Sequence, residues 1–271
     1  LILELDLTGM DPILARAKLV DQFVGLSDYL APDATGGVMV ALWITCHDGS
    51  HQLALVIHHY AVDGVSWRII IDDINTLTQL EPKALEPATV PLRAWSELLV
   101  MQGQEGLRRV EDLFWLQQLK QMTALPVKDS FRDDLNTLEA SEHFTCQLDE
   151  QQTKNLVSAS SSYNGGINDL FLVALGFALR LWAKSNYQFE LNNPVIDIEG
   201  HGREMGVDLT HTLGWFTTVF PVKIRISDLQ PSATEDLGVA IQRVKETLRA
   251  VPDKGLGFGI LRFLDPNSEL S

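Results

Sequence analysis

The chain has few cysteines and few basic residues. Its 271 residues include only Cys46 and Cys146, which lie far apart and match no CxxC or Cys/His ligand spacing. We expect two free, buried thiols, as in a protein of the reducing cytoplasm. Lys and Arg number 21 against 36 Asp and Glu, which gives a net charge of −15. This balance argues against nucleic acid or an anionic membrane surface as a partner, because both attract clustered basic residues.

The sequence also lacks long apolar runs and known cofactor motifs. No stretch approaches about 18 residues without a charge, and no signal-peptide pattern opens the chain, so we expect a cytoplasmic protein. Neither a Gly-rich nucleotide loop nor a metal-spaced ligand set appears, and we therefore predict no directly bound cofactor and no metal. At 45% hydrophobic, the chain is long enough for one large core or two modest ones.

Alternating and helical spacings predict a mixed α/β fold. A strand over 1–7 and a helix over 11–26 precede a hairpin over 38–58, whose Asp48-Gly49 turn joins two apolar strands. Further elements are expected as helices over about 65–80, 92–102, 107–119, 150–160, 168–184 and 235–250, strands over 142–148, 194–199 and 214–226, and a Gly-rich turn over 252–259. Trp95, Phe114 and Trp115 are expected in the core.

A polar stretch over 126–139 separates two parts of similar make-up. We place a subdomain boundary near 140, which gives an N-terminal part over 1–140 and a C-terminal part over 141–271. Mixed strands and helices in both parts fit a layered α/β arrangement.

Residues 58–68 read HHYAVDGVSWR and come directly after an apolar strand. Side chains alternate along a strand, so His58 and His59 cannot both face one cavity. Taken alone, such a pair is more often structural than catalytic. Asp63, beside Gly64, can cap the following helix or pair with an arginine, for which Arg203 is the first candidate.

A second chemical segment is VIDIEGHGRE at 195–204, where Asp197 and Glu199 share one face of a strand. Carboxylates there are costly unless they are paired or functional. Gly200 and Gly202 allow the backbone to bend tightly around His201. From the residues alone, a salt bridge of Glu199 at a strand end is as good a reading as a catalytic one.

Five segments in order resemble the epimerization domains of nonribosomal peptide synthetases, within the superfamily of condensation domains and chloramphenicol acetyltransferases. They are HHYAVDGVSWR at 58–68, INDL at 167–170, EGHGRE at 199–204, LGWFTT through PV at 213–222, and PDKGLGFG at 252–259, with Phe258 where Tyr is usual. The resemblance implies two acetyltransferase-like α/β sandwich subdomains in a V, with an active site in a tunnel between them. The family's PIQ-type opening helix and FNYLG-type motif are missing, so we expect an incomplete domain, truncated at both ends, from a larger synthetase.

The resemblance also assigns roles. His59 and Glu199 become opposed acid and base that epimerize an L-aminoacyl or peptidyl thioester, held on the phosphopantetheine of a peptidyl carrier domain, to the D form. Neighbouring synthetase domains are further expected partners. Asp63, Gly64, Arg203 and His201 become site support, with His201 either donating to the enolate oxygen or holding its loop through a backbone hydrogen bond. Ser66 and Trp67 line the substrate channel, or Trp67 packs in the core.

Two other functions are open. One is a condensation domain that forms an amide bond, against which EGHGRE and GWFTT argue. The other is a noncatalytic remnant that only docks a carrier domain.

Overall fold

The computed structural model describes residues 1–33, 37–81, 83–120, 122–126, 132, 134, 136–203 and 206–271. Contacts between residues group the chain into two compact units. Unit 1 consists of Leu1–Leu98 and His201–Thr217, and unit 2 consists of Leu99–Gly200 and Thr218–Ser271.

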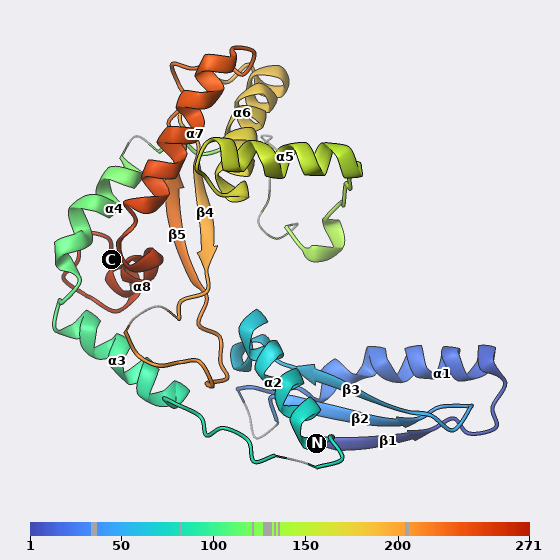
Figure 1. Ribbon diagram of the computed structural model, residues 1–271. Coiled ribbons are helices and arrows are strands. Elements are labelled where there is room, and N and C mark those ends of the chain that lie inside the picture. Colours follow the sequence, from blue (N-terminus) through green and yellow to red (C-terminus); the bar gives the residue numbers. More distant parts are fainter. Residues whose placement is uncertain are drawn as a thin grey trace. The chain divides into compact units, whose positions relative to one another are not determined.

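Unit 1 is built on a three-stranded sheet in the order β1-β2-β3 (Figure 1). Strand β1 (Ile2–Asp6) runs parallel to β2 (Met39–Thr45), and β3 (His51–Ile57) returns antiparallel to β2. Helix α1 (Pro12–Val24) connects the first two strands and begins at Asp11, whose carboxylate accepts hydrogen bonds from two backbone N–H groups of the first turn. The predicted strand, helix and hairpin are all present.

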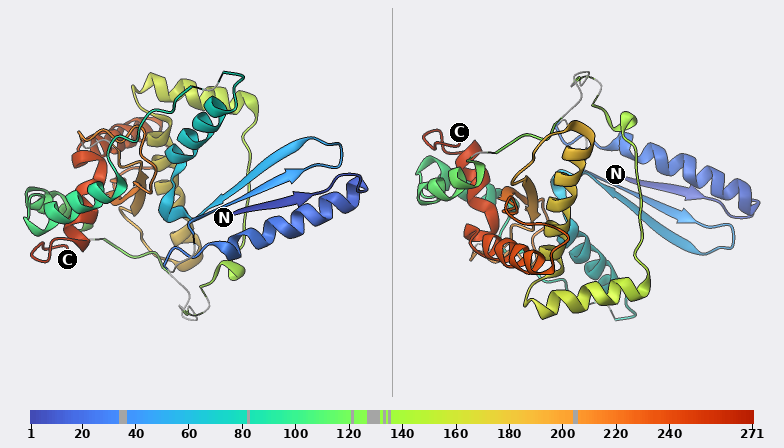
Figure 2. Two further views of the ribbon diagram at one scale, coloured as in Figure 1. Left: turned by 90° about the horizontal axis from the view of Figure 1, so that it is seen from below. Right: turned by 90° about the horizontal axis from the view of Figure 1, so that it is seen from above.

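One face of this sheet forms the core of unit 1. Alternate residues of β1 and β2 pack there with Ala15 of α1, so that Leu5, Val40, Leu42 and Ile44 are buried. The helix runs alongside the strands in all three ribbon views (Figures 1 and 2). The opposite face carries large apolar side chains with partial exposure, namely Met39, Trp43 and Leu53. The strand β3 is therefore less buried than its apolar sequence predicts.

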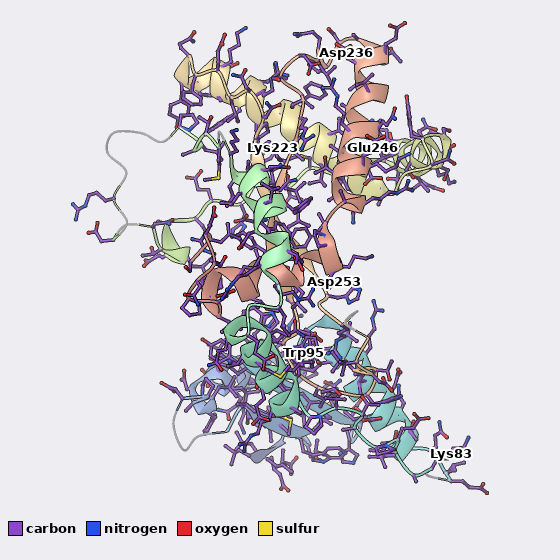
Figure 3. The ribbon with its side chains drawn as sticks, turned by 90° about the vertical axis from the view of Figure 1, so that its left-hand side faces the viewer. Lys83, Trp95, Lys223, Asp236, Glu246 and Asp253 are labelled. Carbon is purple, nitrogen blue, oxygen red and sulfur yellow. The ribbon has the colours of Figure 1, made fainter. Side chains whose placement is uncertain are left out.

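Two helices complete unit 1. Helix α2 (Gly64–Leu77) follows the histidine pair, and α3 (Leu92–Gln104) begins in unit 1 and ends in unit 2. Trp95 of α3, labelled in Figure 3, is 3% exposed and its ring lies 6.0 Å from that of Phe216. The predicted role of Trp95 as a core residue is confirmed.

Unit 2 packs helices around a two-stranded antiparallel sheet. Strand β4 (Val195–Gly200) pairs with β5 (Thr218–Lys223), with Glu199 opposite Val219. Helices α6 (Ile167–Tyr187), α7 (Thr234–Arg249) and α8 (Leu256–Phe263) supply most of the surrounding core, together with α4 (Asp112–Leu119). Helix α5 (Glu150–Ser162) precedes α6, and short 3-10 turns are formed by Gly25–Tyr29, His59–Ala61, Arg109–Glu111, Leu138–Ala140 and Pro252–Gly255.

The centre of unit 2 is aromatic. Trp115 is fully buried, its ring lies 5.2 Å from Phe258 and 6.0 Å from Phe220, and its indole N–H donates to Glu111 at 3.2 Å. Phe114 packs against the same cluster, as predicted. Because Trp115 is central to this core, residues 99–120 group with unit 2. The predicted boundary near 140 differs from this division, in which the residues before and after the polar stretch both belong to unit 2.

Four other sequence predictions differ from the structure. The alternating segment 142–148 forms no strand, and its Phe144 is 91% exposed because no neighbouring strand pairs with it in the described chain. Cys146, in that segment, is exposed rather than buried, while Cys46 is half-buried and both thiols are free. The Gly-rich stretch 252–259 is a turn only as far as Gly255 and then becomes α8. The strand predicted over 214–226 is limited to 218–223.

Candidate functional site

The histidine pair lies at the turn between β3 and α2. Strand β3 ends at Ile57, and His58 caps the 3-10 turn His59–Ala61, with its Nδ1 accepting the backbone N–H of Tyr60 at 3.2 Å. His59 is exposed and His58 is half-buried. The predicted hairpin ended at residue 58, whereas β3 ends at Ile57, so both histidines lie just after the strand. The two side chains still have different environments, with the His58 ring engaged by its own turn.

Asp63 starts helix α2. Its Oδ1 accepts the backbone N–H of Ser66 at 2.7 Å, which satisfies one of the free donors of the first turn. The same carboxylate receives the guanidinium of Arg203, from Nη2 at 3.0 and 3.1 Å and from Nε at 3.3 Å. Both side chains are buried, at 6% and 7% exposure. Asp63 thus performs both of the roles that its position suggested, as helix cap and as partner of Arg203.

Arg203 uses its whole guanidinium within unit 1. Besides Asp63, Nη1 donates to the carbonyl oxygens of Leu209 and Thr212, each at 2.8 Å, and Nη2 donates to the hydroxyl of Ser66 at 3.1 Å. Its carbon centre lies 4.2 Å from the ring of Phe216. Lysine has no planar fork with five donors and could not replace these contacts. Arg203 therefore ties Leu209, Thr212 and Phe216 to the start of α2.

The charge on Asp63 is held by its partners. Burial alone would raise the pKa of this carboxyl group, but the hydrogen bonds from Ser66 and Arg203 and the positive charge of Arg203 outweigh it. The pKa of Asp63 consequently lies below its ordinary value. The carboxylate is ionised at neutral pH, which suits a structural anion rather than a group that gains and loses a proton.

Ser66 is the buried centre of this network. Its hydroxyl donates to the carbonyl oxygen of Gly214 at 3.0 Å and accepts the N–H of Gly214 and the Nη2 of Arg203, both at 3.1 Å. One donor and two acceptor positions are the full capacity of a hydroxyl group. With 0% exposure, Ser66 has no surface for a substrate arm, so its expected place on a channel wall is corrected to a structural one. Trp67 is half-buried, and its place in a channel stays a prediction.

The predictions for the segment after β4 and for the motif glycines have different outcomes. His201 is exposed, and its Nδ1 accepts the backbone N–H of Arg203 at 3.3 Å, which is the loop-holding alternative. Gly202 has φ +65°, a conformation that favours glycine. Gly64 opens α2, but a side chain there would meet no atom within 4 Å, so the structure gives no steric reason for that glycine. Glu204 lies outside the described residues.

Glu199 lies near the end of β4 in unit 2. Ile196 and Ile198 face the core, whereas Asp197 and Glu199 are exposed on the other face, as the alternation predicts. Because both carboxylates are exposed to solvent, they carry no desolvation cost. Glu199 shares its face with Val219, which is 48% exposed. Glu199 is thus accessible on a strand whose other face is fixed by the core.

A left-handed turn supports the end of β4. Asp253, Lys254 and Gly255 all have positive φ, at 39°, 53° and 87°. A Cβ added at Gly200 would lie 3.2 Å from the carbonyl oxygen of Lys254 and 2.7 Å from the hydroxyl oxygen of Thr218. Asp253, labelled in Figure 3, pairs with Arg108. The PDKG segment is therefore packed directly against the glycine that follows Glu199.

The contact that sequence reasoning missed is between His59 and Trp215. Their ring centres lie 4.7 Å apart, and Trp215 also stacks on Tyr60 at 6.0 Å. Tyr60 in turn contacts His58 at 4.5 Å. The LGWFTT motif marked the segment as important, but the spacing along the chain could not show which ring its tryptophan meets.

The described residues offer neither a metal centre nor a simple membrane span. Among them, no group of three or more His, Cys, Asp and Glu side chains could hold a metal ion. Within the same part of the chain, no single helix is long and apolar enough to cross a bilayer. One pair, α5 with α6, meets those criteria only together and bends by 105° at its break.

Comparison with known proteins identifies the family. The model of the condensation domain matches residues 33–269. The chain is 36% identical over 237 residues to bacitracin synthase 2 of Bacillus licheniformis, a match that covers 84% of the chain and 9% of that protein. The chain belongs to the condensation-domain family, and it spans a small fraction of this curated relative.

Solved structures agree on the fold. The epimerization domain from the third module of tyrocidine synthetase B is 31% identical with a TM-score of 0.77, and the match covers 97% of this chain and 58% of that one. The cyclization-docking bidomain of EpoB from Sorangium cellulosum is 17% identical with a TM-score of 0.71, over 96% and 51% of the two chains. The mixed α/β fold is thus that of condensation and epimerization domains, of which the chain covers about half.

Proposed function

We propose that this chain is part of an epimerization domain of a nonribosomal peptide synthetase. It converts an L-aminoacyl or peptidyl thioester, carried on the phosphopantetheine of a peptidyl carrier domain, to the D form. The observation that carries this proposal is the match to the tyrocidine epimerization domain at 31% identity over 97% of the chain. Several condensation domains match the same fold at only 14–17% identity.

The chemistry needs two proton-transfer groups. The thioester carbonyl makes the Cα proton removable because charge moves onto the enolate oxygen as the C–H bond breaks. One group removes the proton from one side of Cα, and the other returns a proton on the opposite side, so no atoms are gained or lost. We assign these roles to His59 and Glu199, which are both exposed and both able to transfer protons. No directly bound cofactor takes part.

The buried residues have a different task. Asp63, Arg203 and Ser66 hold the start of α2, which follows His59, and bond to one another. The left-handed turn at 253–255 holds the end of β4 beside Glu199. Each support fixes the backbone near a proton-transfer residue, and a fixed backbone keeps the position of that residue constant during reaction.

The principal rival is condensation. The matched family model is that of the condensation domain, and condensation also uses a carrier-bound thioester, which an amine on a second carrier attacks. The variant Glu199→Gln separates the two, because amide formation has no need for a second proton-transfer group on the opposite side of Cα. A noncatalytic docking module would bind a carrier domain and leave its thioester unchanged.

The test measures stereochemistry at Cα. A carrier domain loaded with an L-aminoacyl pantetheine thioester is incubated with the chain, both alone and within the longest natural polypeptide that contains it, and the released amino acid is resolved on a chiral column. We expect a mixture of L and D forms, with His59→Gln and Glu199→Gln each about 100- to 10,000-fold slower. His143→Gln, at an exposed position of unit 2, is the matched control and should be unchanged. Only L product from both proteins, with demonstrated carrier binding, would refute the proposal.

A further inference from the structure

The starting observation is an exposed tryptophan with an unusually well-fixed backbone. Trp215 is 46% exposed, while the next residue, Phe216, is 3% exposed. Burial alternates from Thr212 to Phe216, so that Thr212, Gly214 and Phe216 are buried within unit 1 while Leu213 and Trp215 are exposed. Exposure alone does not distinguish Trp215, because Trp43 and Trp182 are exposed to a similar extent; its surroundings do.

Both neighbours of Trp215 are anchored. Gly214 is held through both its N–H and its carbonyl oxygen by the single hydroxyl of Ser66. Phe216 packs under the guanidinium of Arg203 and against Trp95, and its N–H donates to Asp63 at 3.4 Å. The backbone of Trp215 is thus fixed on each side by buried groups.

The same anchors also fix His59. Asp63 and Ser66 follow His59 in the chain by four and seven residues, so the network that holds 214 and 216 holds the histidine turn as well. The indole of Trp215 contacts the imidazole of His59, with ring centres 4.7 Å apart and planes inclined by 51°. Aromatic pairs favour such offset and tilted geometries at 4.5–7 Å. This is the ring contact that the structure gives to an otherwise exposed imidazole.

We propose that Trp215 is a positioning residue for His59, and that Ser66 sets the contact by clamping Gly214. The assignment of a purpose to this orientation rests on the proposed function, in which His59 transfers a proton. The contact itself does not depend on it. The two parts can therefore be tested separately.

The first arm reports the contact by NMR. With 13C-labelled histidine, the His59 ring signal is identified by its loss in His59→Gln, and the indole shifts it by its ring current. In Trp215→Leu this signal should move toward that of exposed His143, and in Ser66→Ala it should move part of the way. Trp182→Leu, which removes a tryptophan of similar exposure on α6, should leave it in place. An unchanged signal in Trp215→Leu would overturn the proposal, whatever the activity.

The second arm reports the purpose by kinetics. Trp215→Leu should lower kcat for epimerization by about 10- to 100-fold, because a misplaced reacting group costs this much. KM should stay within about twofold, and Trp215→Phe, which keeps a ring, should restore most of kcat. A raised KM with unchanged kcat would mean that the indole binds substrate and would overturn the positioning role. If the unmodified protein does not epimerize, the proposed function fails, and the NMR arm still decides whether the clamp exists.

Discussion

At the scale of single residues, the structure separates saturated groups from accessible ones. Asp63, Ser66 and Arg203 are buried and satisfy one another with hydrogen bonds. His59 and Glu199 are exposed. A buried, fully bonded residue is suited to holding geometry, whereas an accessible imidazole or carboxylate is free to meet a substrate. Substitutions in the buried group should therefore lower stability, whereas substitutions in the exposed group should lower turnover.

Asp63→Ala should lower stability before it affects chemistry. It leaves the Arg203 guanidinium buried without its carboxylate, which typically costs about 3–5 kcal/mol in the free energy of unfolding. Urea unfolding of the wild type and the variant measures this loss, and Asp197→Ala, at an exposed carboxylate, is the control. A variant that keeps its unfolding midpoint and loses only turnover would place Asp63 among the reacting groups instead.

The same carboxylate predicts a dependence of stability on pH. Because the pKa of Asp63 is lower in the folded protein than the ordinary value of about 3.9, its ionised form stabilises the fold. This contribution is complete above pH of about 4 and is lost as pH falls toward the lowered pKa. In Asp63→Asn the fall of the unfolding midpoint between about pH 5 and pH 2 should be shallower than in the wild type. Equal slopes would contradict the assignment.

At the scale of elements, two glycines with the same backbone conformation differ in how closely another element approaches them. Gly255 has φ +87°, and a Cβ there would lie 1.8 Å from the ring of Phe220, on β5. Gly49 has φ +81° in the β2–β3 turn, with no atom within 4 Å of an added Cβ. The two positions share the backbone conformation and differ in the space around them. Comparing them separates the cost of placing a side chain in the left-handed region from the cost of overpacking.

Gly255→Ala should therefore be the more damaging of the two. Each substitution places alanine in the left-handed region at about 1–2 kcal/mol, and only Gly255→Ala adds overpacking, at about 1–3 kcal/mol. Urea unfolding with fluorescence detection gives the free energies of both variants. If Gly49→Ala proves equally costly, the close approach of the PDKG turn to β5 is not what this glycine provides.

Much of the local structure could be predicted from sequence, and the failures share one cause. Asp11 before an apolar helical pattern and Asp48-Gly49 between two apolar runs carry their own capping and turn chemistry, so those elements were predictable. The Asp63–Arg203 pair was predictable from the family resemblance, which requires the two motif segments to converge. The alternation around Phe144 indicated a strand, but a strand also needs a partner, which local sequence does not contain. The His59–Trp215 contact depends on how distant segments fold together, and no spacing encodes it.

At the scale of the whole molecule, the division into two units has a consequence for stability. Trp115 belongs to the core of unit 2, although it precedes the polar stretch by more than ten residues. Trp115→Ala should cost about 3–5 kcal/mol and should do so locally. Hydrogen exchange should become faster for amides of β5, while amides of β2 in unit 1 keep their protection. Equal acceleration in both strands would show that the two units unfold together.

In the proposed function, this chain makes and reprotonates a carbanion at the α carbon of a carrier-bound thioester. The most direct measurement of this step is mass spectrometry of an L-aminoacyl carrier domain incubated with the chain in deuterated water, in the longest natural polypeptide that contains it. We predict deuterium at Cα together with D product, and loss of the D product when His59 or Glu199 is replaced. An unlabelled Cα, under conditions where the carrier domain is shown to bind, would contradict the account.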